Sequence, residues 1–171
     1  VADLIQRGWE LELGLVDIDD RALETAARLS HKMIAARQAP ITLSPSTDRR
    51  EVLEAATAVI TTIAVGGRRA WELDVQIPRK YEIYQPVGDS VMPGGSSRAL
   101  RMIPPMIAIA ADVVELAPDA LFFNYGNPMA CVCRGIGKAT GAKVVGLCHR
   151  VHQVGRYLAQ VVGVEPERFR Y

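Results

Sequence analysis

A thiol and an imidazole stand side by side near the end of this chain, where Cys148 closes a predicted strand and His149 follows it. Both side chains can bind a metal ion, and both can act as acid–base groups. The same pair is compatible with a structural cysteine in the core and a histidine on the surface. Two side chains do not complete a metal site. A metal ion bound here would therefore need further ligands from beyond Tyr171, from a substrate or from water.

Asn127 follows another predicted strand, residues 120–125, and precedes a helix predicted over residues 128–140. Its amide can form a hydrogen bond with a ligand hydroxyl, and it can equally cap the helix. The other two cysteines, Cys131 and Cys133, fall inside that helix and point in different directions. We interpret both as structural.

An acid and a pair of glycines end two further predicted strands. Asp17 closes residues 12–17, where a carboxylate can accept hydrogen bonds from an adenosine ribose, although a helix-capping or loop acid fits the position too. Gly66 and Gly67 follow residues 58–65 and would let the backbone approach a ligand closely or simply form a turn. The glycine-rich loop that should precede Asp17 would lie before Val1, so these cofactor-binding candidates depend on context alone.

Apolar runs alternate with amphipathic segments, which predicts right-handed βαβ units and a parallel sheet. The predicted strands are residues 12–17, 40–43, 58–65, 120–125 and 143–148, and the predicted helices are one ending at Gly8, then 19–36, 50–56, 96–116, 128–140 and 154–162. The β-branched run 58–65 is typical of a strand buried on both faces. A long irregular connection is expected up to Gly95, and Pro104–Pro105 should kink or split the following helix.

The predicted fold class is therefore α/β, a Rossmann-like doubly wound parallel sheet that is incomplete at both ends. Ligands bind such sheets beyond the carboxyl ends of the strands, where all the candidate residues fall. With 171 residues the chain has room for one domain, and its net charge of +1 gives no footprint for nucleic acid or an anionic membrane. No apolar run is long enough to span a bilayer, and three cysteines favour a reducing cytoplasm over a disulfide framework.

Taken together, these segments resemble the NAD-dependent glycoside hydrolases of family 4. The matching stretches follow one another in the same order along nearly the whole chain: residues 15–19, 65–67, Asp74 with Ile77, Pro78 and Tyr81, then 85–89, 93–95, 98–104, 124–129 and 146–149. The family fold is related to that of lactate and malate dehydrogenases. The resemblance implies that residues 1–171 are a truncated NAD-binding domain, with the C-terminal substrate domain absent.

The resemblance also implies an enzyme, a glycosidase that hydrolyses O-glycosidic bonds with NAD and a divalent metal, usually Mn²⁺. Such enzymes do not use a pair of carboxylates. NAD⁺ oxidises the sugar C3 hydroxyl, a tyrosine removes the acidified C2 proton, and the aglycone leaves by elimination. Addition of water and reduction of the ketone complete the cycle, while the metal acts as a Lewis acid. The implied partners are a small glycoside and further copies of the chain, as a dimer or tetramer.

By position, the resemblance makes Cys148 a metal ligand and Asn127 a sugar-binding residue. Asp89 matches an acid that raises the basicity of the catalytic tyrosine. His149 stands where phospho-α-glucosidases of the family carry an acidic proton donor, so it is the second catalytic candidate. A histidine there resembles the branch that acts on non-phosphorylated α-galactosides, α-glucosides or uronides. Trp71, where the phosphosugar branch tends to have arginine, indicates the same branch.

Glu82 and Met92 depart from the family pattern, because each replaces a usual glycine beside the substrate loop. The chain also stops at Tyr171, before the expected Gly-x-Asn-His segment and the catalytic tyrosine. We therefore expect the 171-residue chain alone to lack glycosidase activity. Two alternatives remain open: a 2-hydroxyacid dehydrogenase of the lactate or malate type, because its motif resembles Asn127-Pro128-Met129, and a non-catalytic NAD-binding domain.

Overall fold

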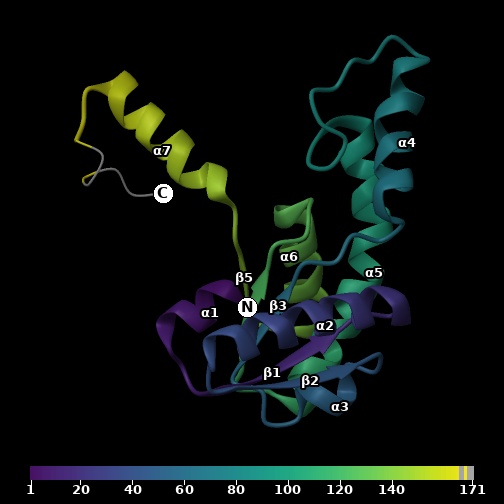
Figure 1. Cartoon of the computed structure of the whole chain (residues 1–171). Helices are drawn as coiled ribbons and strands as arrows, with labels where there is room; N and C mark the ends of the chain where they lie inside the picture. The colour runs from purple at the N-terminus through teal and green to yellow at the C-terminus, as the bar shows by residue number, and fades with distance from the viewer. Residues whose placement is uncertain (166–167, 169–171) are drawn as a thin grey trace. The chain divides into compact units, whose positions relative to one another are not determined.

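Strands and helices alternate along the chain in the computed structural model, as the sequence predicts (Figure 1). The structure describes residues 1–165 and 168, without the side chains of His149 and His152. The elements are α1 (Ala2–Arg7), β1 (Leu11–Val16), α2 (Asp20–Arg37), β2 (Ile41–Ser46), α3 (Arg50–Leu53), β3 (Ala58–Thr61), α4 (Gly67–Arg79), α5 (Met92–Leu116), β4 (Leu121–Asn124), α6 (Met129–Thr140), β5 (Val144–Gly146) and α7 (His149–Val162). They form two compact units, residues 1–57 with 112–120 and residues 58–111 with 121–171.

The first unit contains a pair of parallel strands, β1 and β2, with Leu11 opposite Ile41 at one end. Helix α2 packs on both strands and buries Leu23 and Ala27. Its first turn is capped by Asp19, whose carboxylate accepts hydrogen bonds from the backbone N–H groups of the next turn at 2.9 and 3.1 Å. The glycine C-cap of α1 is also confirmed, since Gly8 adopts φ 65°.

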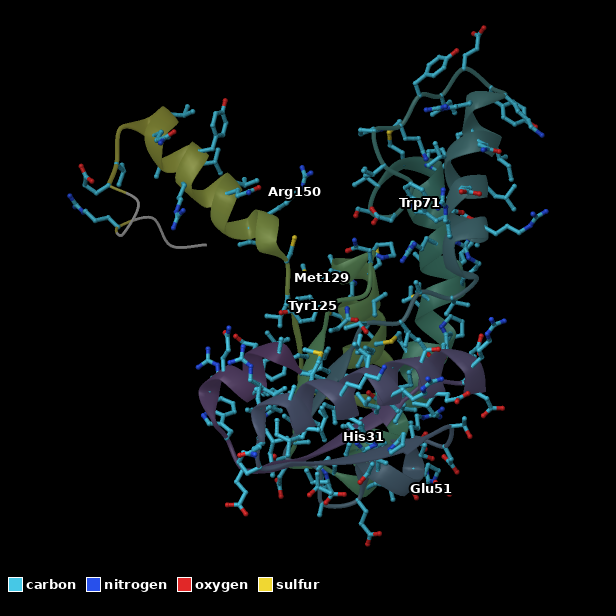
Figure 2. The ribbon with its side chains drawn as sticks, in the orientation of Figure 1. His31, Glu51, Trp71, Tyr125, Met129 and Arg150 are labelled. Carbon is cyan, nitrogen blue, oxygen red and sulfur yellow. The ribbon has the colours of Figure 1, made fainter. Side chains whose placement is uncertain are left out.

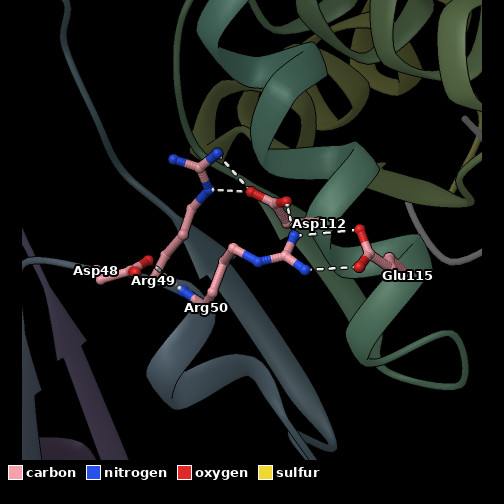
Figure 3. Close-up of polar contacts among 5 residues, drawn as sticks. All are labelled: Asp48, Arg49, Arg50, Asp112 and Glu115. Atoms are coloured by element: carbon pink, nitrogen blue, oxygen red, sulfur yellow. Dashed lines mark hydrogen bonds and ion pairs between the residues drawn. The ribbon is translucent and has the colours of Figure 1, made fainter.

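An ion-pair network in the first unit joins α3 to the end of α5 (Figure 3). Arg50 binds Glu115 at 2.6 and 3.1 Å and also pairs with Asp112, which in turn accepts a hydrogen bond from Arg49. Burial alone would raise the pKa of Asp112, but the hydrogen bonds from the two arginines outweigh it and hold that pKa below its usual value. The network ties a four-residue helix, too short to be stable by itself, to a long one.

The second unit contains the parallel sheet β3-β4-β5. Helix α6 packs against β5, and the face that it covers buries Phe122. The side chains of the opposite face remain open: Ile60 is 63% exposed, Leu121 64% and Val145 52%. The prediction that residues 58–65 are buried on both faces is therefore wrong for this unit. A β-branched run indicates a strand in apolar surroundings, but it does not show whether one or both faces of that strand are covered.

The two largest differences from the sequence prediction lie on either side of Gly95. The expected irregular connection contains a thirteen-residue helix, α4, because the sequence between Gly67 and Arg79 is amphipathic, although it begins with glycine and has Pro78 in its last turn. Helix α5 begins at Met92 and is continuous for 25 residues, so the two prolines do not split it. Its buried stripe of Met102, Met106 and Ala110, four residues apart, holds the helix together through packing despite two missing N–H donors.

Smaller differences concern element ends. Strand β3 and helix α3 are shorter than predicted, β2 is longer, and α7 begins at His149 and not at Val154. Among the described residues, none of the helices has the length and hydropathy needed to cross a membrane.

Candidate functional site

The carboxyl ends of β3, β4 and β5 lie at one edge of the second sheet. Thr61, Asn124 and Gly146 stand opposite one another in the register, so the loops that leave the three strands emerge together. These loops lead to α4, α6 and α7, and they carry five of the seven predicted site residues: Gly66, Gly67, Asn127, Cys148 and His149. This is the edge where ligands bind in a parallel α/β sheet.

Asn124, at the end of β4, organises this edge although the sequence analysis did not single it out. It is fully buried, and its side-chain oxygen accepts hydrogen bonds from Gly126 N at 2.9 Å and Thr61 Oγ1 at 3.2 Å. Its amide nitrogen donates to the Gly126 carbonyl at 3.0 Å. A buried amide with these partners folds the backbone back on itself, and so sets the direction in which Asn127 leaves the strand. Tyr125 and Met129 flank this loop (Figure 2).

Asp89 and Asn127 are brought together, 38 positions apart in the sequence. The Asn127 amide nitrogen donates to Asp89 Oδ2 at 3.1 Å, and Ser90 Oγ donates to Asp89 Oδ1 at 2.9 Å. The reading of Asn127 as the N-cap of α6 is wrong, because Pro128 is the N-cap and no side chain caps that helix. The amide points to the carboxylate instead, which leaves one amide N–H and the amide oxygen for a ligand.

A buried ion pair holds the segment that carries Asp89 against α5. Asp74 of α4 has a side chain only 3% exposed and binds Arg101 through two hydrogen bonds of 2.6 and 2.9 Å. Burial alone would raise the pKa of Asp74, but hydrogen bonds to Arg101 and Ser97, together with the charges of Arg101 and Arg98, outweigh it, so that pKa lies below its usual value. Gln85 joins the same cluster by donating to the Asp74 carbonyl at 2.8 Å and accepting from Gly94 N at 2.9 Å.

Gly66 and Gly67 lie at the start of α4, five residues after β3, and not directly at the strand end as predicted. Both have positive φ, 81° and 55°. A Cβ at Gly67 would meet no atom within 4 Å, so the backbone there is open to a ligand. An open backbone at the start of a thirteen-residue helix fits a dinucleotide phosphate.

Asp17, the other cofactor candidate, lies in the first unit just after β1. Its side chain is exposed, and one carboxylate oxygen accepts a hydrogen bond from Asp19 N at 3.0 Å. The reading of Asp17 itself as a helix cap is excluded, because Asp19 caps α2. The second carboxylate oxygen accepts no hydrogen bond from the described part of the chain, which fits a ribose hydroxyl.

Cys148 is exposed and forms the N-cap of α7, and His149 is the first residue of that helix. The prediction for the His149 imidazole falls on a side chain outside the described residues. Within the described part of the chain, no three His, Cys, Asp or Glu side chains form a metal-binding group. A divalent metal therefore has one described candidate ligand here, which does not make a complete site.

The two helical cysteines differ in burial. Cys133 is half-buried against Asn124, and burial raises the pKa of its thiol, whereas Cys131 is exposed on the outside of α6. His31 is exposed on α2.

The parallel strands, the intervening helices and the candidate residues at the strand ends define a Rossmann-like nucleotide-binding fold. The chain belongs to the family 4 glycosyl hydrolases, whose family model matches residues 5–164. It is 40% identical over 153 residues to an alpha-glucosidase of Erwinia rhapontici, covering 88% of this chain and 34% of that protein. It is 39% identical over 124 residues to an alpha-galacturonidase of Bacillus subtilis, covering 70% of this chain and 28% of that protein.

A solved structure of a Thermotoga maritima 6-phospho-beta-glucosidase with manganese, NAD⁺ and glucose-6-phosphate matches the fold with a TM-score of 0.78. Sequence identity is 22%, and the match covers 97% of this chain and 40% of that one. The family prediction and the fold class are thus confirmed, and the 2-hydroxyacid dehydrogenase alternative is not. The chain spans about a third of the length of the curated relatives it matches.

Proposed function

We propose that the protein to which this chain belongs is a glycosidase that hydrolyses a non-phosphorylated α-glycoside with NAD and a divalent metal. The chain would be its NAD-binding part. The observation that carries the proposal is the hydrogen bond of 3.1 Å between Asn127 and Asp89, at the strand edge where ligands bind in a parallel α/β sheet. The two residues come from segments 38 positions apart, and the matched family supports a ligand-binding reason for their meeting.

The residues of the chain have distinct parts in this proposal. Asn127 would bind a sugar hydroxyl through the amide atoms that Asp89 does not use, and Asp89 would keep the amide in one orientation. In the second unit, Gly66 and Gly67 would let the backbone approach a dinucleotide phosphate. In the first unit, Asp17 would accept hydrogen bonds from a ribose hydroxyl. When bound, NAD⁺ supplies reversible oxidation at the sugar C3 hydroxyl.

Cys148 would supply one ligand to the metal, with the remaining ligands coming from outside the described residues. His149 would act as an acid–base group in place of the acidic donor of the phosphosugar enzymes. We also propose a cytoplasmic homo-oligomer. Three free cysteines support the reducing compartment. The net charge of +1 gives no reason to add a nucleic-acid or membrane partner.

The test uses the full-length protein with nitrophenyl α-glucoside, α-galactoside and α-galacturonide, and with their 6-phosphorylated counterparts, each with and without NAD⁺ and Mn²⁺. We expect hydrolysis of a non-phosphorylated substrate that requires NAD⁺ and is lost after chelation. Product formed in D₂O should carry deuterium at C2. Hydrolysis without NAD⁺, or a preference for the phosphorylated sugar, would refute the proposal.

A matched pair of variants tests the site itself. Asn127→Ala should lower kcat/KM by about 10-fold or more, which corresponds to the loss of one or two hydrogen bonds to substrate. Ser96→Ala, at an exposed position of α5, serves as the control and should leave kcat/KM unchanged.

A further inference from the structure

Asn127 is held at two points, and the second involves a residue with no role so far. Arg98 of α5 donates from Nε to the main-chain carbonyl oxygen of Asn127 at 3.1 Å. Asp89 binds the side-chain amide of the same residue, also at 3.1 Å. One contact fixes the backbone and the other fixes the rotation of the side chain, so together they leave the Asn127 amide little freedom.

Arg98 is not occupied elsewhere in the described part of the chain. Its neighbour one turn along, Arg101, uses both terminal nitrogens on Asp74 and Ser97. Arg98 makes no ion pair with a described carboxylate, although it lies close enough to Asp74 for its charge to lower the pKa of that acid. A half-buried arginine that directs its one described hydrogen bond to the carbonyl of a site residue is not explained by surface solvation alone.

Arg98 and Arg101 bind different parts of the second unit. The Asp74–Arg101 pair joins α4 to α5, and its described side-chain hydrogen bonds reach no residue of the β4–α6 loop. Arg98 reaches that loop directly from the same helix, because residues three apart lie on one face. A charge-assisted hydrogen bond to a carbonyl is stronger than a neutral one and tolerates less movement of its acceptor.

We propose that Arg98 is a positioning residue, which fixes the main chain of Asn127 so that its amide meets the sugar hydroxyls at one angle. The inference rests on the proposed function, since it takes Asn127 as the sugar-binding residue. Displacing a substrate by about 1 Å costs on the order of 100-fold in rate, so a clamp on the binding amide has a measurable consequence.

The test compares Arg98→Ala with Arg134→Ala, an exposed arginine of α6, in the full-length enzyme. For Arg98→Ala we expect kcat/KM to fall about 10- to 100-fold, with NAD⁺ affinity and thermal midpoint close to wild type. Added guanidinium at millimolar concentration should restore part of the activity of Arg98→Ala but none of that of Asn127→Ala. Arg134→Ala should match wild type.

Three outcomes would overturn the assignment. The first is unchanged kcat/KM in Arg98→Ala, and the second is equal loss of NAD⁺ affinity and thermal midpoint, which would mark a purely structural residue. The third is a loss at least 10-fold greater on the galacturonide than on the galactoside, because a residue that binds the substrate carboxylate directly is not a positioning residue.

A further measurement distinguishes failure of the proposed function from failure of the role proposed for Arg98. If the wild-type enzyme hydrolyses none of the glycosides, hydrogen exchange of the segment 124–129 still tests the clamp. That segment should exchange about 10-fold faster in Arg98→Ala than in Arg134→Ala if the contact fixes the backbone, and equally fast if it does not.

Discussion

Removal of Arg101 should be costly to the second unit, because it leaves the buried Asp74 without its ion-pair partner. The Asp74 side chain is 3% exposed, and Arg101 supplies two of its hydrogen bonds. Breaking a buried pair by removing one partner costs about 3–5 kcal/mol. Arg101 itself is 28% exposed, so solvent softens the loss and the lower end of that range applies. We expect Arg101→Met to lower the thermal midpoint by roughly 6–12 °C.

The pH dependence supplies an independent check with a fixed sign. The folded-state pKa of Asp74 lies below its unfolded value of 3.8, so the pair stabilises the fold above that value and loses its effect as the pH falls through the folded-state pKa. In Arg101→Met the hydrogen bonds and the charge of Arg101 are lost, and only Ser97 and the charge of Arg98 still oppose burial, so the pKa of Asp74 rises relative to wild type. The difference in unfolding free energy between wild type and variant should therefore be largest near pH 7 and shrink below about pH 4.

The assay is denaturant unfolding of the full-length protein at pH 7 and at pH 3.5, followed by tryptophan fluorescence. Asp74→Asn with Arg101→Met, made together, is the matched control, because a neutral amide removes the buried charge and should recover part of the stability. A variant that is equally destabilised at both pH values would refute the electrostatic reasoning, and would leave packing as the cause.

Gly94→Ala should destabilise the protein severely, because the added Cβ would lie 2.6 Å from the Asp74 carbonyl oxygen. Gly137→Ala, whose Cβ would have its nearest contact at 4.0 Å, is the control and should not destabilise it. The thermal midpoints of the two variants test this prediction. Glu82→Gly should raise stability by about 0.5–1 kcal/mol in denaturant unfolding, because Glu82 adopts φ 60°, and an unchanged or lowered midpoint would contradict the strain. Iodoacetamide at pH 8 should modify Cys131 before Cys133, since burial raises the pKa of the second thiol; equal rates by mass spectrometry would contradict this.

The sequence predicts those parts of the fold that depend on interactions between residues close together in the chain. The Asp19 cap and the Gly8 terminator were predictable because each acts within one turn of its own helix. The burial of Asn124 and its link to Thr61 were not, because a strand-end asparagine looks the same whether its partners lie inside the sheet or in solvent. Helix α4 was missed because glycine, proline and tyrosine near its ends masked an amphipathic interior.

The candidate site also contains residues that the sequence could predict and residues that it could not. Residues at the strand ends could be chosen from sequence because parallel topology alone brings them to one edge. Whether Asp89 reaches that edge depends on the path of the chain between α4 and α5. Hydrogen bonds between residues distant in sequence determine that path, so the local sequence does not predict it. Only the family pattern indicated Asp89. The same pattern also predicts glycine at two positions in and beside the connection between α4 and α5. Glu82 and Met92 occupy those positions with φ 60° and 63°.

In and beside the connection between α4 and α5, the chain therefore adopts positive φ at two positions where it carries a residue other than glycine. A non-glycine residue with positive φ costs on the order of 1 kcal/mol and persists only where the surrounding structure holds it. The surrounding structure here is the cluster of Asp74, Gln85 and Arg101, which fixes both ends of the segment that carries Asp89.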